Sequence, residues 1–327
     1  MSQSEITTPI EKKRASPRSW QNRLGRILLL ILIFYVGIIL LLTLIQRKLI
    51  YHPTKAATLN AKDWGFTEGR CLPMIFEVEP GYTLHGWHVL PPSHQALNRE
   101  EQQQELDSER PVIIYYPGNA GHRGYRADQL KRLSSLNADI FLIDYRGYAE
   151  NPGSPSEQAY LHDARFIWDA LVEEYQIEPA RIILLGESLG GGIATALANQ
   201  LSQEGTAPAG LFLQAPFSSL VAIAGERFPW LPVDWMMADR FPSIERIPEV
   251  TCSITIIHGR QDSIIPFAQA QQLFEAAPDH SSDRISKTFI EIPGAGHNDI
   301  FMMAETEYLR ALEKMFKPIR QKNIPKP

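Results

Sequence analysis

Short apolar runs alternate with longer segments of helical periodicity over most of the chain, and this alternation constrains the fold more than any other feature. Six runs have the length and composition of buried strands: Val112–Tyr116, Ile140–Asp144, Ile182–Leu185, Leu211–Gln214, Ile254–His258 and Lys287–Ile292. The helical segments are Tyr125–Leu136, Glu157–Tyr175, Leu189–Gln203, Phe267–Glu275 and Asp299–Phe316. Apolar strands connected by helices are typical of a parallel sheet that is covered on both faces. We therefore predict an α/β fold with a mostly parallel sheet.

The sequence also predicts two more strands and two irregular segments. Ile75–Val78 and Tyr82–Leu90 flank a turn, which brings the predicted sheet to eight strands. Residues 93–110 are polar, and we expect them to form an exposed loop. Residues 216–247 are rich in aromatic side chains and proline, so we expect a short lid over the sheet rather than another strand and helix.

The amino-terminal region has the composition of a membrane anchor. Residues 27–45 read ILLLILIFYVGIILLLTLI, without a charge. Nineteen helical residues span about 28 Å, close to the hydrocarbon thickness of a bilayer. A core helix would have a polar face, and a signal peptide would have a shorter apolar run before a cleavage site. We predict a basic tail over 1–26, a transmembrane helix over 27–45, and a globular domain over 50–320.

Charge sets the expected orientation and excludes one class of partner. Six Lys or Arg residues precede the apolar run and four follow it closely, so the positive-inside rule places the amino terminus in the cytoplasm. The domain that follows the helix is then expected on the far side, for example in a periplasm. Beyond residue 48 the chain holds 24 basic and 35 acidic residues, which makes nucleic-acid binding a poor expectation. The two cysteines cannot form a thiolate zinc site, and we predict no metal and no organic cofactor.

One of the predicted strands leads directly into a candidate nucleophile. The sequence Gly186-Glu187-Ser188-Leu189-Gly190 follows the strand at 182–185 and opens the helix at 189–203. G-x-S-x-G between a strand and a helix is the pattern of a nucleophilic serine on a sharp turn, with Gly186 and Gly190 allowing close backbone approach. No phosphate-binding glycine motif can be drawn through this segment. We predict that Ser188 is the nucleophile.

A serine hydroxyl needs a base, and the base needs an acid that orients it. Three histidines follow Ser188, and His297 is the predicted base because it lies in a glycine-rich loop after the last strand. His258 is expected to be a packed structural residue and His280 to be exposed. Asp262 is the predicted acid because it closely follows the penultimate strand. The other candidates for the acid are Asp234 and Asp239 in the lid, while Asp299 is expected to cap the last helix.

Two backbone N–H groups are needed to bind the oxyanion of an acyl-transfer intermediate. Leu189 follows the nucleophile and is expected to supply one of them. The second is expected from the loop Pro117-Gly118-Asn119-Ala120-Gly121, with Asn119 as the donor by position. Asp144 and Arg146 lie in another loop, DYRGY, and are interpreted as structural ion-pair residues.

With these motifs in place, the chain resembles the α/β-hydrolases. It is most similar to the membrane-anchored group related to α/β-hydrolase-domain serine esterases, lipases and depalmitoylating thioesterases. Five stretches carry the resemblance: YYPGNAGH, DYRGY with the following PSE, GESLGGG, HGRQDSIIP and GAGHND. That group usually has His where this chain has Pro117, and Gly where it has Ala149. The oxyanion donor is a backbone group, so the first difference leaves the assignment of Asn119 unchanged.

The resemblance implies a membrane-anchored serine hydrolase that cleaves carboxylic ester or thioester bonds. The anchor and the aromatic lid favour acyl or lipid substrates. Two alternatives remain: a serine peptidase of the same fold, and a non-catalytic, membrane-tethered binding module.

Overall fold

The computed structural model describes residues 17–106 and 109–322 and divides the chain into two units, Met1–Gln46 and Arg47–Pro327. Helix α1 (Pro17–Ile50) runs through the first unit and ends in the second. Within the described chain, Trp20–Ile50 is the one helix that is long and apolar enough to cross a membrane. Its apolar side chains, such as Phe34 and Leu44, are exposed rather than packed in a core.

The second unit contains an eight-stranded sheet in the order β10-β9-β8-β7-β4-β6-β3-β2. Its strands are β2 (Cys71–Glu79), β3 (Tyr82–Val89), β4 (Val112–Tyr116), β6 (Asp139–Ile143), β7 (Ile182–Glu187), β8 (Gly210–Gln214), β9 (Ser253–Gly259) and β10 (Thr288–Ile292). All neighbours from β10 to β6 pair in parallel, and β3 pairs antiparallel with both β6 and β2. The predicted eight-stranded, mostly parallel sheet is therefore confirmed.

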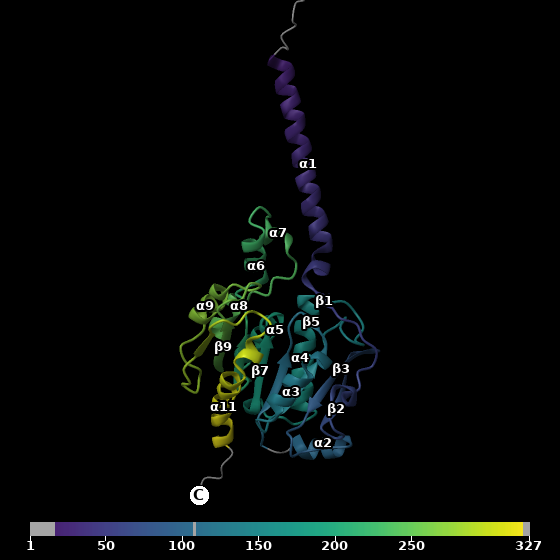
Figure 1. Cartoon of the computed structure of the whole chain (residues 1–327), viewed down its shortest axis with the longest axis vertical. Helices are drawn as coiled ribbons and strands as arrows, with labels where there is room; N and C mark the ends of the chain where they lie inside the picture. Colours follow the sequence, from purple (N-terminus) through teal and green to yellow (C-terminus); the bar gives the residue numbers. More distant parts are fainter. Residues whose placement is uncertain (1–16, 107–108, 323–327) are drawn as a thin grey trace, which may run out of the picture. The chain divides into compact units, whose positions relative to one another are not determined.

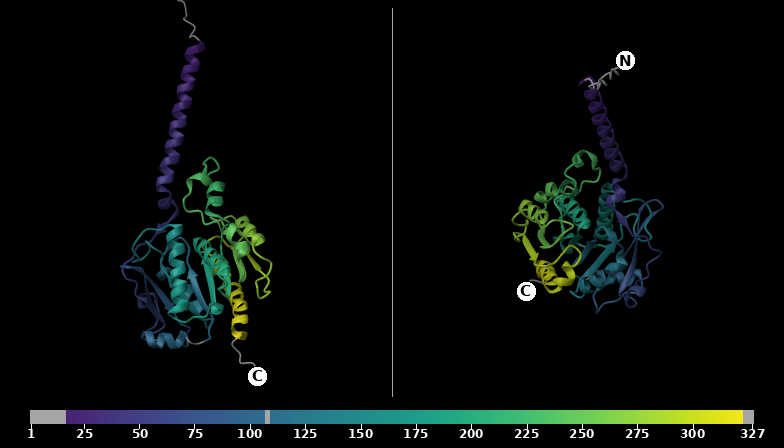
Figure 2. Two further views of the ribbon diagram at one scale, coloured as in Figure 1. Left: turned by 180° about the vertical axis from the view of Figure 1, so that it is seen from behind. Right: turned by 45° about the horizontal axis from the view of Figure 1, so that its top comes forward.

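Helices cover both faces because each central strand is apolar on both sides. Along β4, the side chains of Val112, Ile114 and Tyr116 join one core, and those of Ile113 and Tyr115 join the other. The first core includes α4 (Glu157–Glu173), α5 (Leu189–Gln203) and α9 (Phe267–Ala276). The second includes α3 (Ala127–Ser134) and α11 (Glu305–Lys322). Figure 1 shows α3 and α11 in front of the sheet, and the reverse view in Figure 2 brings α4 forward.

The polar segment 93–110 differs from its prediction, because it contains helix α2 (Arg99–Leu106) with Gln102 and Leu106 buried. The reason is a polar network that only the tertiary structure assembles. The Nε2 group of Gln102 donates to Nδ1 of the buried His88, 2.9 Å away, and His88 Nε2 donates to Asp139 at 3.0 Å. Arg110 binds the same carboxylate through Nε at 3.0 Å.

The segment between β8 and β9 contains three short α-helices, the 3₁₀ turn η4 (Ile247–Glu249) and no strand in its described residues. The α-helices are α6 (Leu220–Arg227), α7 (Val233–Met236) and α8 (Ser243–Arg246). Figure 1 shows α6 and α7 projecting beyond the sheet, away from α2. We keep the name lid for residues 216–247. A further pair of very short parallel strands, β1 (His52–Pro53) and β5 (Ala120–Gly121), lies outside the main sheet.

Candidate active site

The turn between β7 and α5 holds Ser188 in a strained conformation. Its φ is 52° and its ψ is −113°, a region that residues with a side chain rarely adopt. The Ser188 N–H donates to the Gln214 carbonyl at 2.9 Å, and its own carbonyl accepts the Gly191 N–H at 2.9 Å. Hydrogen bonds on both sides therefore hold the strained turn.

Glycine is required at positions 186 and 190 because neighbouring backbone atoms lie too close to leave room for a side chain. A Cβ on Gly190 would lie 2.0 Å from the carbonyl oxygen of Tyr116 at the end of β4. A Cβ on Gly186 would lie 2.6 Å from the carbonyl oxygen of Gly190. These distances are far below van der Waals contact, so a side chain at either position would displace the turn from the sheet.

The structure brings Ser188, His297 and Asp262 together in hydrogen-bonding order. His297 Nε2 lies 3.0 Å from Ser188 Oγ, and His297 Nδ1 lies 2.7 Å from Asp262 Oδ2. His280, in contrast, is exposed. The two lid aspartates lie elsewhere, because Asp239 binds Arg47 and Asp234 binds Arg240.

Asp262 is buried but surrounded by donors. Its Oδ1 accepts the backbone N–H groups of Ile264 and Ile265, both at 2.8 Å. Its Oδ2 lies 3.2 Å from Nε2 of His258, in addition to the contact with His297. Burial by itself would raise the pKa of Asp262, but the hydrogen bonds from His258 and His297 outweigh it and hold the pKa well below its ordinary value. Asp262 is therefore ionised at neutral pH.

His258 is buried, as expected of a packed residue, but it also contacts the acid. Its Nε2 lies 3.0 Å from the Ile265 carbonyl and 3.2 Å from Asp262. Both neighbours are acceptors, so this nitrogen carries the proton. Sequence reasoning missed this contact. The spacing of four residues between His258, near the strand end, and Asp262 could have indicated it.

Hydrogen bonds hold the loop that carries His297. The Asp299 carboxylate accepts the Gly296 N–H at 2.7 Å, and the Gln261 N–H donates to the Ala295 carbonyl at 2.9 Å. The prediction that Asp299 caps the last helix is wrong. Asp299 precedes the short helix α10 (Ile300–Met303), and its side chain makes no capping bond there.

The loop after β4, residues 117–121, faces Ser188 and is called the oxyanion loop below. Gly118, Asn119 and Leu189 line the same pocket as Ser188. Leu189 is the first residue of α5, so its N–H has no partner within the helix. Two tyrosines of the DYRGY segment support the loop, which the sequence analysis did not anticipate. The Tyr145 hydroxyl donates to the Pro117 carbonyl at 2.7 Å, and the Tyr148 hydroxyl donates to the Asn119 carbonyl at 2.7 Å.

The ion pairs of the same segment involve different partners. Asp144 pairs with Arg123, and Arg146 lies 2.6 Å from Asp163. Both residues thus take part in ion pairs, as interpreted from the sequence, but not with each other.

The pocket at Ser188 has a volume of about 610 Å³, within the range of small-molecule sites. Its apolar lining comes from the end of α1, from the lid and from the segment after β9, and includes Leu49, Ile50, Phe217, Leu220, Ile223 and Ile264. Glu187 is the single carboxylate among the residues described as lining it, and Arg126 binds it at 3.1 Å. Arg47 also binds Asp239 of the lid. Arg47, which lies before the predicted start of the domain at residue 50, is thus in contact with the lid.

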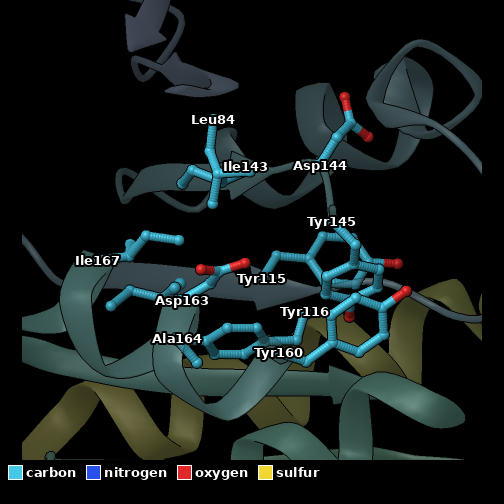
Figure 3. A pocket seen from close by; sticks show the side chains of 11 residues that line it. Leu84, Tyr115, Tyr116, Ile143, Asp144, Tyr145, Tyr160, Asp163, Ala164 and Ile167 are labelled. Carbon is cyan, nitrogen blue, oxygen red and sulfur yellow. The ribbon is translucent and has the colours of Figure 1, made fainter. Parts of the chain in front are cut away.

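A second, interior pocket lies between β4, β6 and α4, and Figure 3 shows the side chains that line it. Its lining includes Tyr145, whose hydroxyl binds the Pro117 carbonyl, but not Ser188. In the described part of the chain, no three His, Cys, Asp or Glu residues are placed to hold a metal ion.

Comparison with known proteins agrees with this geometry. A family model described as serine aminopeptidase, S33, matches residues 107–245. An uncharacterized protein of Mycobacterium tuberculosis is 35% identical over 263 residues, covering 80% of this chain and 84% of that protein. The lysophosphatidylserine lipase ABHD12 of Danio rerio is 31% identical over 287 residues, covering 80% of this chain and 74% of the relative.

Among solved structures, the Pyrococcus furiosus esterase Pf2001 superposes with a TM-score of 0.60. The match covers 82% of this chain and 99% of the esterase, at 14% sequence identity. At that identity the likeness concerns the fold alone.

Proposed function

Because the chain belongs to the α/β-hydrolase superfamily, as a serine hydrolase of the esterase and lipase kind, we propose that it hydrolyses acyl esters or thioesters through Ser188, His297 and Asp262. The observation that carries this proposal is the hydrogen-bonded series from Ser188 Oγ through His297 to Asp262, at 3.0 and 2.7 Å, inside an apolar pocket. Nucleophile, base and acid are each within reach of the next.

Acylation begins when Ser188 Oγ attacks the acyl carbonyl and passes its proton to His297 Nε2. Asp262 accepts the hydrogen bond from His297 Nδ1 and stabilises the imidazolium that forms. The N–H groups of Asn119 and Leu189 bind the oxyanion of the tetrahedral intermediate. When the intermediate collapses, His297 returns the proton to the leaving alcohol or thiol, and the acyl group remains on Ser188.

Deacylation repeats these steps with water as the nucleophile. His297 takes a proton from the attacking water, and the second tetrahedral intermediate uses the same two N–H groups. Its collapse breaks the ester to Ser188, releases the carboxylic acid and returns the proton to the serine oxygen.

The pocket favours a substrate with an apolar acyl chain. Its lining is largely aliphatic and aromatic, and the lid supplies much of it. The similarity to a lysophosphatidylserine lipase supports the same substrate class, so we propose a lipid that carries an acyl chain on a polar headgroup.

The aminopeptidase description of the matched family model favours a second candidate, cleavage of an amide next to a free amino group. Such a substrate brings an ammonium group that needs a free carboxylate. The described lining offers Glu187, which is already bound to Arg126 and to the Tyr115 hydroxyl. We therefore favour the ester substrate over the peptide.

We further propose that α1 spans a membrane, with residues 27–45 in the hydrocarbon. The excess of basic residues before this run supports a cytoplasmic amino terminus and a catalytic domain on the opposite side. This arrangement places the enzyme where acyl lipids are concentrated.

The test is labelling of the purified full-length protein with a fluorophosphonate, followed by a panel of ester, thioester and aminoacyl-amide substrates. We expect labelling of the wild type and none of Ser188→Ala, which should also lose about 10⁴–10⁶-fold in turnover. Equal labelling of the variant would contradict the assignment of Ser188. Absence of labelling and of turnover in the wild type would favour a non-catalytic binding module.

A further inference from the structure

We propose that Arg47 and residues 50–54 act as a positioning element of the active site, holding the oxyanion loop on one side and the lid on the other. We call this set the brace. It deepens the proposed function and rests on it, because the loop it contacts is the one assigned to bind the oxyanion. The brace follows the apolar run with only Gln46 between Ile45 and Arg47, and α1 continues without interruption to Ile50.

The brace contacts the oxyanion loop through three independent sets of backbone and side-chain groups. Strand β1 (His52–Pro53) pairs in parallel with β5 (Ala120–Gly121), which is the end of that loop. The Gly121 N–H donates to Oγ1 of Thr54 at 3.2 Å. The side-chain amide of Asn119 donates to the carbonyl of Ile50. The residue proposed as oxyanion donor is therefore held directly by the brace.

A second path reaches the same loop through aromatic packing. Tyr51 is buried, and its ring meets that of Tyr160 edge-on with centroids 5.4 Å apart. Tyr160 stacks on Tyr145 at 4.6 Å, and Tyr145 donates its hydroxyl hydrogen bond to Pro117. Figure 3 shows Tyr145 and Tyr160 next to each other. A displacement of Tyr51 would therefore also displace Pro117, the first residue of the oxyanion loop.

On the other side of the pocket, the brace is bound to the lid. Arg47 donates to Asp239 from Nε at 2.9 Å and from Nη2 at 3.2 Å, a bidentate pair. Asp239 is 2% exposed and also accepts the Glu157 N–H at 3.1 Å, which fixes this end of the lid to the start of α4. Ile50 lines the pocket between these two attachments.

The geometry of an oxyanion hole tolerates little displacement, since a shift of about 1 Å can cost about 10²-fold in rate. No flexible linker separates the apolar run from the brace. The brace therefore acts through Asn119 rather than on the substrate itself.

The experiment compares Thr54→Val with Thr54→Ser in the full-length protein. Valine keeps the shape of the side chain but removes the acceptor for the Gly121 N–H, whereas serine keeps the hydroxyl. With a short soluble ester we expect Thr54→Val to lower kcat about fivefold, with KM changed less than about twofold, since one hydrogen bond contributes about 1 kcal/mol. Thr54→Ser should restore kcat to within about twofold. Thr58→Val, at an exposed threonine outside the brace, is the matched control and should leave kcat unchanged.

The lid attachment is tested by Arg47→Gln, with Lys48→Gln as the control at the adjacent exposed cation. We expect Arg47→Gln to lower kcat/KM about three- to tenfold and Lys48→Gln to leave it within about 1.5-fold. An equal effect of the two substitutions would show that only net charge matters and would overturn this part of the proposal.

Hydrogen exchange at Gly121 provides a readout that does not depend on turnover. We expect faster exchange in Thr54→Val and wild-type exchange in Thr54→Ser and Thr58→Val. Faster exchange with unchanged kcat would overturn the positioning role. A decrease in kcat that is fully explained by a smaller fraction of folded protein would also overturn it. A wild type that neither takes the fluorophosphonate nor cleaves esters would instead contradict the proposed function, and the exchange pattern would still decide whether Thr54 holds the loop.

Discussion

The carboxylate of Asp262 is surrounded by two backbone N–H groups and by the side chains of two histidines. This environment lowers the pKa of Asp262 although burial opposes ionisation. At the residue scale, this single charge contacts and orients His297. Its removal should therefore lower the rate of catalysis, in addition to any effect on packing. Its ionised form is a property of the folded site, because the unfolded chain has none of these donors.

We expect Asp262→Asn to lower kcat by about 10²–10⁴-fold while the protein remains folded, because the amide cannot stabilise an imidazolium. Asp234→Asn serves as the control at the exposed lid position. A larger loss from Asp234→Asn or Asp239→Asn than from Asp262→Asn would move the acid into the lid.

The same carboxylate gives a prediction about stability and pH. The folded pKa lies below that of the unfolded chain, which is about 3.9. The stabilisation by ionised Asp262 is therefore fully present above that value and is lost as the pH falls through the lower folded pKa. The difference in unfolding free energy between wild type and Asp262→Asn should be constant from about pH 6 to 8 and should shrink below about pH 4. Denaturant titrations at several pH values measure it, and a difference that grows on acidification would contradict the assignment.

His258 contacts the acid but not the nucleophile, so we expect it to position Asp262. His258→Ala should lower kcat by about tenfold and leave KM within about twofold, because one of the hydrogen bonds to Asp262 is lost. His280→Ala, at an exposed histidine of the same half of the chain, is the control. If both variants retain full kcat in the folded protein, His258 does not position Asp262 and has only a packing role.

At the scale of elements, the lid has both a pocket-lining side and an exposed aromatic tip. Its inner side chains line the pocket at Ser188, while Trp235 is 92% exposed, Trp230 55% and Phe228 45%. Tryptophan is enriched at membrane–water interfaces, where the ring is amphipathic. An aromatic tip on the lid is well suited to contact the bilayer from which, as we propose, the substrate is drawn.

We expect Trp230→Ala combined with Trp235→Ala to lower activity on vesicle-borne acyl lipid by about three- to tenfold and to spare a short soluble ester. Less apolar area would then enter the interface, at about 25 cal/mol per Å². Leu97→Ala is the matched control, because Leu97 is 65% exposed but lies outside the lid. Equal losses on both substrates would mean that the tryptophans support the lid's own structure.

At the scale of the whole molecule, the chain joins an apolar helix to a hydrolase domain without a spacer. Arg47 lies in the compact unit Arg47–Pro327 and binds Asp239 of the lid. Shortened forms of the protein should therefore keep Arg47.

A form that begins at Gln46 should hydrolyse a short soluble ester at the full-length rate. The same form should lose about tenfold or more on vesicle-borne lipid, because it lacks the effective concentration that anchoring provides. Rates on the two substrates, measured side by side with the full-length protein in the same vesicles, check this. Equal loss on both would mean that residues before Gln46 support the fold, and no loss on either would argue for a soluble natural substrate.

The parts of the fold that follow from short-range patterns could be read from the sequence. Each apolar strand, the elbow around Ser188 and the order of β and α elements depend on neighbours within a few residues, where periodicity and glycine placement are informative. The candidate residues Ser188, Asp262 and His297 were found in the same way, from their places after strand ends. Their catalytic roles stay predictions until the variants are measured.

The tertiary structure decided what depends on partners far apart in the chain. Arg47 and Asp239 are separated by 192 positions, and Asn119 and Ile50 by 69, so no local pattern links them. The polar composition of residues 93–110 predicts a loop, whereas helix α2 forms because His88 on β3 and Met74 on β2 accept hydrogen bonds from the buried Gln102 amide. The sequence by itself determined the layers of this protein and the strand ends that carry its chemistry. The packing of distant segments decided how the oxyanion loop and the lid are held, because a hydrogen bond or ring contact forms only after the fold has placed both partners.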